Sequence, residues 1–247
     1  MTLLEAIDRR HSVRRYSGDV IEPDKENSLR ESIANYNKQG KLNIEWVSDG
    51  SAALRGRGKF HGVRALIALK APSAAPRALE QLGYYGEYLV LEAVSLGLSA
   101  CFVSAFSRDN RIFHLAKKER ILAVLAVGYP EGKAGRPAHR KTPEEISMID
   151  CQVPDWFPEG VNAAAKAPSS HNRQPVMFFC MNQFVFASVR RIDGFYPMDL
   201  GIAKANFEIA AGGKFEFGNG GLFTKQKKSK KTKHIIEQPP ARAEEDS

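Results

Sequence analysis

Cysteine, membrane-length apolar runs and metal-ligand spacings are scarce or missing in this sequence. The 247 residues include three cysteines, Cys101, Cys151 and Cys180, whose odd number and wide spacing exclude a disulfide scaffold and indicate a reducing compartment. Charged residues within the first ten positions exclude a signal peptide, and no later segment has the apolar length of a membrane span. The histidines show no metal-binding spacing, so we expect no metal. A cytoplasmic protein without membrane contact is the expectation.

Positive charge is concentrated at the C-terminal end. The formal net charge is +8, of which residues 225–247 carry +3. The lysines from Lys225 to Lys233 lack aromatic neighbours and helical periodicity, so we predict a disordered Lys-rich tail at 225–247. A solubilising extension and a contact with nucleic-acid phosphates are both open, but no nucleic-acid recognition motif accompanies the lysines, which disfavours nucleic acid as a partner.

Helical and strand patterns alternate along the rest of the chain. A short amphipathic helix is expected around Leu3, Leu4, Ala6 and Ile7, and a second starts at Pro23, a residue that helix starts favour. This alternation is typical of an α+β or α/β protein with three layers. The predicted helices are 23–39, 76–97, 109–117, 155–166 and 199–211, and the predicted strands are 43–48, 63–70, 99–105, 121–128 and a hairpin of 175–181 with 184–189.

Two short motifs far apart in the sequence carry the strongest chemical signal. The first is Arg10-His11-Ser12-Val13-Arg14. In an extended backbone Arg10, Ser12 and Arg14 project to one side, where two guanidinium groups and a hydroxyl suit a phosphate. If the preceding helix continued instead, Ser12 would point away from both arginines, and the segment would be a basic helix end.

The second motif is Ala167-Pro-Ser-Ser-His-Asn-Arg-Gln-Pro175. Its hydroxyls and amide can donate and accept hydrogen bonds, which suits the polar edge of a planar heterocycle. Pro, Ser and Asn also favour turns, so an ordinary turn at the exit of the helix 155–166 is the alternative.

Three segments, residues 4–16, 83–102 and 167–175, together resemble the nitroreductase family of FMN oxidoreductases, over about residues 3–217. Ordinary members place the Pro-Ser motif soon after the Arg-Ser-Arg motif, whereas here it comes only after Lys166. This order is similar to the duplicated single-chain branch labelled TM nitroreductase. The resemblance implies an α+β, nitroreductase-like three-layer fold and a pseudo-dimer of two related halves, 1–150 on the FMN phosphate side and a shortened 151–224 on the Pro-Ser side, with the tail at 225–247.

The resemblance also implies which residues bind FMN. Chemistry would occur on the flavin, so no catalytic side chain is expected. Lys59 would face the flavin pyrimidine or be a solvated loop lysine, and Lys141, with Arg140 as the adjacent alternative, would add a phosphate ligand or merely precede a helix start. The full predicted set is Arg10, Ser12, Arg14, Lys59, Ser104, Ala105, Arg140, Lys141, Pro168, Ser169, Ser170 and Asn172.

The implied function is hydride transfer from NADH or NADPH through FMN to a small conjugated acceptor such as a nitroaromatic or a quinone. Reductive dehalogenation, enoyl-type reduction or fragmentation of the flavin are alternatives on the same scaffold. A non-catalytic flavin-binding or nucleic-acid-associated protein is a further alternative. We expect a monomer that acts as an internal pseudo-dimer and holds one FMN.

Overall fold

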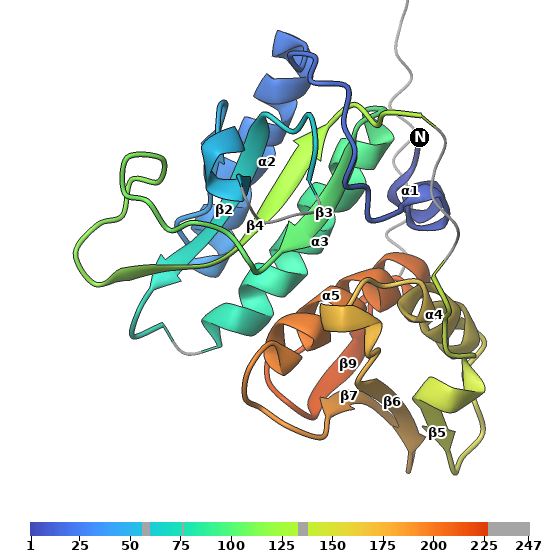
Figure 1. Cartoon of the computed structure of the whole chain (residues 1–247). Helices are drawn as coiled ribbons and strands as arrows, with labels where there is room; N and C mark the ends of the chain where they lie inside the picture. The colour runs from blue at the N-terminus through green and yellow to red at the C-terminus, as the bar shows by residue number, and fades with distance from the viewer. Residues whose placement is uncertain (56–59, 76, 133–137, 227–247) are drawn as a thin grey trace, which may run out of the picture.

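Two β-sheets lie on either side of a central layer of helices (Figure 1). The computed structural model describes residues 1–55, 60–75, 77–132 and 138–226. The first sheet has the order β1-β2-β4-β3 and is antiparallel, and the second has the order β5-β6-β7-β9-β8 with β5 parallel to β6. The strands are β1 (Glu45–Val47), β2 (Ala65–Pro72), β3 (Ser99–Val103), β4 (Glu119–Gly128), β5 (Ser147–Ile149), β6 (Val176–Met181), β7 (Phe184–Val189), β8 (Gly213–Phe215) and β9 (Gly221–Lys225).

The helices of the described residues connect and cover these sheets. This arrangement confirms the predicted mixed α+β class. The α-helices are α1 (Leu3–Arg9), α2 (Pro23–Gly40), α3 (Ala78–Ser95), α4 (Trp156–Ala165) and α5 (Tyr196–Ala211), and the short 3-10 helices are η1 (Ser51–Leu54), η2 (Glu144–Ile146) and η3 (Ser170–Asn172).

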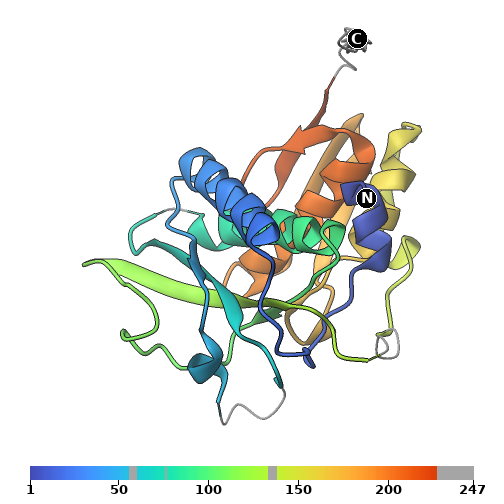
Figure 2. The ribbon, with the colours of Figure 1, turned by 90° about the horizontal axis from the view of Figure 1, so that it is seen from above.

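Helices α3 and α5 cross in the middle layer, where α3 lies on the first sheet and α5 on the second (Figures 1 and 2). A Cβ atom at Gly83 would lie 2.9 Å from the carbonyl carbon of Met198, and one at Gly201 would lie 2.9 Å from that of Glu80. Each glycine thus faces the carbonyl three residues before the other. Because a side chain would separate the backbones at this point, the crossing requires glycine on both helices.

The two sheets share one apolar core. Buried side chains of the first sheet and α3, such as Leu69 and Leu89, belong to the same contiguous cluster as Phe178 of β6 and Phe207 of α5. The Phe178 and Phe207 rings stack with centroids 4.9 Å apart. The described chain is therefore held as one body through the helical layer.

Helix α1 docks where α3, α4 and α5 meet, as both views show. Thr2 and Glu5 form a capping box at its start, and its buried Ala6 and Ile7 belong to a cluster with Leu91 and Ala163. The helix ends at Arg9, so the next residue leaves the junction in an extended conformation.

The predicted helix at 109–117 is wrong. One turn forms, because the amides of Ile112 and Phe113 both donate to the Asp109 carbonyl, and Phe113 is buried beneath it. Beyond this turn the residues have no helical structure.

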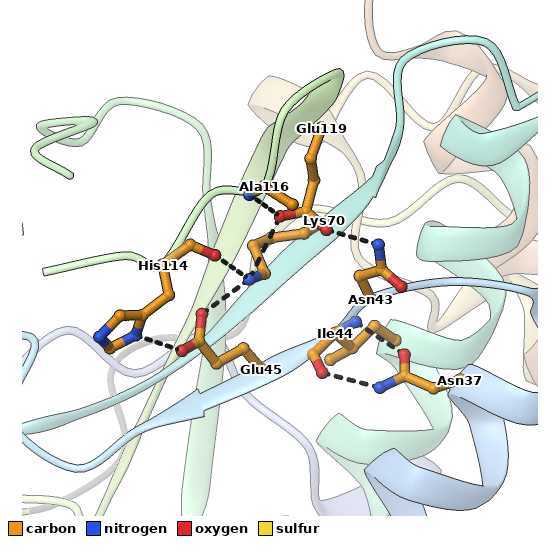
Figure 3. Close-up of polar contacts among 8 residues, drawn as sticks. All are labelled: Asn37, Asn43, Ile44, Glu45, Lys70, His114, Ala116 and Glu119. Atoms are coloured by element: carbon orange, nitrogen blue, oxygen red, sulfur yellow. Dashed lines mark hydrogen bonds and ion pairs between the residues drawn. The ribbon is translucent and has the colours of Figure 1, made fainter.

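Side chains of the first sheet take the backbone groups that a longer helix would have used (Figure 3). Buried Lys70 donates to the carbonyl of His114 at 2.6 Å and pairs with Glu45 at 2.9 Å and Glu119 at 3.5 Å. The amide of Ala116 donates to the Glu119 carboxylate at 3.0 Å. A buried ammonium group needs this many oxygen partners, so the loop stays irregular to supply a carbonyl.

The structure confirms the predicted hairpin as β6 and β7 and adds β5, β8 and β9, which the sequence did not reveal. Strand β5 pairs with β6 so that Ile149 faces Cys180, and the following turn brings Cys151 Sγ to 3.1 Å from Cys180 Sγ. Two of the three widely spaced cysteines therefore lie together as free thiols.

Two sequence predictions fall partly outside this description. Lys59 lies outside the described residues, as does the tail beyond Gln226. Among the described helices, none combines the length and apolar character that crossing a membrane needs.

Candidate functional site

Arg10 links the first motif to the start of the second. Its guanidinium is buried, with a side chain only 4% exposed, although the residue follows an exposed helix end. Nη2 donates to the carbonyl of Lys166 at 3.1 Å, Nη1 donates to Ser12 Oγ at 3.4 Å, and Nε lies 3.9 Å from Glu87 Oε1. Lys166 directly precedes the second motif, so this one side chain joins segments more than 150 positions apart.

The rest of the first motif runs alongside β3. Arg10 has an extended conformation (φ −64°, ψ 125°), and Ser12 forms a parallel bridge with Ala100. The alternative of a continued basic helix is therefore wrong. Ser12 and Arg14 are exposed, and the positive charge of Arg14 acts on the buried thiol of Cys101, whose pKa is raised by burial.

The second motif is a strained turn held by internal hydrogen bonds. Ser169 Oγ accepts from the Gln174 amide at 2.9 Å, and the Ser170 amide donates to Asp199 of α5 at 2.9 Å. His171, Asn172 and Gln174 all have positive φ, between 48° and 55°. Such a run of left-handed non-glycine residues persists only where the surroundings enforce it, a situation common at ligand-binding sites.

Arg140 and Lys141 both bind the second motif. Arg140 Nη1 donates to the carbonyl of Ala167 at 2.9 Å and to Asn172 Oδ1 at 3.1 Å. Lys141 Nζ donates to the carbonyl of Gln174 at 3.0 Å. The Lys166 and Ala167 carbonyls lie at the C-terminal end of α4, where the helix dipole stabilises cations.

Glu87 of α3 is a carboxylate on which the charges of both Arg10 and Arg140 act. It is fully buried, and within the described residues neither of its oxygens has a hydrogen-bond partner, nor does Arg10 Nε. Burial raises the pKa of Glu87 to about 8, although Arg10 and Arg140 oppose the shift. Burial and the like charge of Arg10 lower the pKa of Arg140. Positive charge is thus gathered here with little compensation.

This donor set fits a phosphate group. Two partly desolvated guanidinium groups with an exposed serine and a further arginine nearby offer forked N–H donors and a hydroxyl, which is the chemistry that phosphate oxygens accept. The orphaned Nε of Arg10 faces buried Glu87, whereas Nη1 is directed toward exposed Ser12, on the side where phosphate oxygens could accept from it. The described residues contain no group of His, Cys, Asp and Glu that could hold a metal ion.

The other predicted residues lie after β3 and in the second motif. Ser104 and Ala105 follow β3 and are exposed; within the described residues, neither side chain forms a hydrogen bond with the cluster. Pro168 and Ser169 line a small cavity beneath the second motif together with Gln174 and Asp199. A second cavity of about 150 Å³, beside Tyr16, contains none of the predicted site residues.

Sequence reasoning missed Glu87 and Asp199. Glu87 is the one charged residue in the segment Gln81 to Leu91, and a lone acid in an apolar helix is a signal that could have identified it. Asp199 begins the apolar run of α5 and gives no comparable signal. Burial raises its pKa to about 6, while its hydrogen bond from Ser170 opposes the shift.

The sequence matches the family described as "Putative TM nitroreductase" over residues 2–211. None of the curated proteins matches the chain. The crystal structure of a putative nitroreductase from Thermotoga maritima is similar with a TM-score of 0.63 and 19% identity, over 90% of this chain and 92% of that one.

Shorter structures match about half of the chain. A putative NADH dehydrogenase/NAD(P)H nitroreductase from Bacteroides thetaiotaomicron has a TM-score of 0.47 at 23% identity, over 58% of this chain and 95% of its own. An FMN-dependent nitroreductase from Clostridium difficile has a TM-score of 0.42 at 19% identity, over 53% of this chain and 90% of its own.

Proposed function

Because this chain belongs to the TM nitroreductase family, we propose that it is an FMN-dependent NAD(P)H oxidoreductase. It takes hydride from NADH or NADPH and reduces a small conjugated acceptor such as a nitroaromatic or a quinone. FMN supplies the redox chemistry when bound, and the protein supplies binding, orientation and electrostatics.

One observation carries the proposal. Arg10 of the first motif donates to the Lys166 carbonyl, and Arg140 donates to the Ala167 carbonyl one residue later. These contacts bring together a phosphate-type donor set and the Pro-Ser turn, the two parts that the family resemblance assigns to one flavin site.

In this proposal each side chain has a limited role. Arg10, Ser12 and Arg14 bind the FMN phosphate, with Arg140 as the further basic ligand. Lys141 donates to the Gln174 carbonyl and so stabilises the turn of the second motif. Pro168, Ser169, Ser170 and Asn172 border the flavin ring on the other side, and Ser104, Ala105 and Lys59 complete the expected set.

We also propose that the chain is a pseudo-dimer of residues 1–150 and 151–224 that holds one FMN. The reciprocal contact between Gly83 and Gly201 supports this. In a two-fold symmetric pair of helices, a residue of one helix contacts the partner in the same way as the equivalent residue of the partner contacts it. A monomer in solution follows, since the second half supplies the surface that a second subunit would offer.

Flavin titration of the purified apoprotein tests the proposal. The fluorescence of FMN should be quenched as it binds, and binding should saturate at one FMN per chain. The loaded protein should oxidise NADH or NADPH when a nitroaromatic or quinone is added. Replacing Arg10 and Arg14 by alanine removes two charge-assisted contacts worth about 1.5 to 3 kcal/mol each, so the affinity should fall at least about 100-fold.

Arg9 and Arg15 provide a matched control. Both are exposed neighbours of the motif, and Arg15 pairs with exposed Glu131. The double alanine variant at these positions should bind FMN within about twofold of the wild type if local contacts, not overall charge, set the affinity. A colourless protein that takes up no FMN would refute the proposal, and two flavins per chain would refute the single shared site.

A further inference from the structure

Glu87 contacts the phosphate cluster from its buried side. Of the three guanidinium nitrogens of Arg10, Nε faces Glu87 at 3.9 Å, Nη2 is bound to the Lys166 carbonyl, and only Nη1 turns toward exposed Ser12. The buried edge of Arg10 is therefore set by Glu87, and the outer edge is left for a ligand.

Within the part of the chain that the structure describes, both oxygens of Glu87 lack hydrogen-bond donors, and its side chain is 0% exposed. A carboxylate sealed in this way is stable only beside compensating charge; otherwise it takes up a proton. Arg10 and Arg140 are the two charges that act on it.

Other elements packed against α3 direct their titratable groups elsewhere. With one exception, each of these groups is bound to a partner other than Glu87. They are Asp8 of α1, bound to Lys166; Tyr36 of α2, bound to Glu92; Lys70 of β2, bound to Glu45 and Glu119; and Lys204 and Glu208 of α5, bound to Glu80 and Tyr84 respectively. The exception is the Cys101 thiol of β3, which Arg10 and Arg14 affect; burial raises its pKa, so it stays neutral where Glu87 titrates.

We propose that Glu87 is a proton-exchanging counter-charge of the phosphate site: when it is ionised, its carboxylate neutralises part of the charge of Arg10 and Arg140, and a phosphate that binds these arginines favours the protonated form of Glu87, with the proton taken from solvent. This inference rests on the proposed FMN site. Glu87 is a positioning residue, since it acts on the ligand through Arg10.

The coupling makes phosphate affinity depend on pH in the alkaline range. Because the pKa of Glu87 is raised to about 8, its ionised form predominates at pH 9 and competes with the anion for the arginines. The protonated, binding-competent fraction is then about one tenth, so FMN affinity should fall about tenfold between pH 7 and pH 9. The phosphate itself, with a second pKa near 6, is already a dianion over this range.

The test measures FMN and inorganic phosphate affinity from pH 7 to 9 in wild type, Glu87→Gln and Glu92→Gln. Glutamine keeps the shape of Glu87 but is always neutral, so Glu87→Gln should bind FMN equally well at both pH values and about tenfold better than wild type at pH 9. Glu92 is a matched control, a largely buried carboxylate on the same helix with its pKa raised by burial and bonded to Tyr36. Its variant should keep the wild-type slope.

Riboflavin, which lacks the phosphate, should show no such slope in any of the three proteins. Wild-type FMN binding that is independent of pH, or a Glu87→Gln variant with an unchanged slope, would overturn this inference and leave the proposed FMN function intact. A wild type that binds neither FMN nor inorganic phosphate at pH 7 would overturn both.

Discussion

Substituting alanine for Gly83 or Gly201 should separate α3 from α5 and destabilise the whole described body. The added Cβ would lie 2.9 Å from a carbonyl carbon of the facing helix in either case, and closer still to the carbonyl oxygen. Carbon atoms in ordinary contact lie about 3.5 to 4.0 Å apart, so the helices must move apart by roughly 1 Å. The facing atoms are backbone and cannot rotate away.

The expected cost follows from this displacement. Overpacking of a close-packed interior costs about 1 to 3 kcal/mol, and more where the backbone must move. Alanine recovers roughly 0.5 to 1 kcal/mol through its better helix propensity. We therefore expect a net loss of about 2 kcal/mol per variant, and for a domain of this size a melting temperature lower by about 4 to 8 °C.

Thermal unfolding followed by circular dichroism measures this loss, and Gly86→Ala provides the control. Gly86 lies on the same helix, but its Cβ would meet the ring of Phe102 at 3.1 Å, a side chain that can shift. That variant should stay within about 2 °C of the wild type. Because both crossing glycines open the same contact, the double variant should lose less than the sum of the single losses. Additive losses, or a single variant that melts like the wild type, would refute the reciprocal contact.

Two further predictions concern buried acids and thiols. Burial raises the pKa of Asp199 from 3.8 to about 6, so its stabilising contribution is complete below pH 4 and about 3 kcal/mol of stability is lost by pH 7. Urea titrations should show that Asp199→Asn lacks this loss, and an equal dependence of stability on pH in both proteins would contradict it. Hydrogen peroxide should join Cys151 to Cys180, whose sulfurs need to close from 3.1 Å to about 2.05 Å. Thiol titration after denaturation should then fall from three to one per chain, with roughly 3 to 4 kcal/mol of added stability, and consumption of Cys101 instead would contradict the pairing.

The fold could be predicted where local signals were strong. The apolar spacing of Leu3, Leu4, Ala6 and Ile7 and the Pro23 start marked two helices, and the apolar runs of β2 and β4 marked central strands. Strands β5 and β8 have three residues each, too few for a visible alternation. The segment 109–117 carried a helical pattern, but buried Lys70 takes the His114 carbonyl, and this tertiary demand overrides the local preference.

The sequence indicated which residue types belong to the candidate site, but not which of them contact one another. Arg10 and the turn after Lys166 could be identified as half-sites from their residue types, yet the hydrogen bond between them depends on how α1 docks against α3 and α4. The family resemblance placed Lys141 before Arg140, because adjacent basic residues give no local signal that separates them. In the structure the charges of Arg10 and Glu87 act on the pKa of Arg140, whereas Lys141 binds the Gln174 carbonyl. Glu87 lies on α3 and affects Arg10 and Arg140 through its charge. No spacing of residues in the sequence indicates that these three side chains come together.

In the proposed phosphate site, the two buried arginines are held in place by the protein itself, and this determines which groups can change its affinity. Arg10 and Arg140 are already ordered by the Lys166 and Ala167 carbonyls, so a ligand is spared roughly 0.5 to 1.5 kcal/mol for each side chain that would otherwise be immobilised. Those carbonyls carry fixed partial charges that do not respond to pH. Among the described residues, Glu87 is the group on the buried side of Arg10 whose charge changes near neutral pH, because burial raises its pKa to about 8. Under the proposed function, affinity for the phosphate should therefore depend on protonation inside the protein core, and a single oxygen-to-nitrogen replacement at Glu87 should remove that control without moving the arginines.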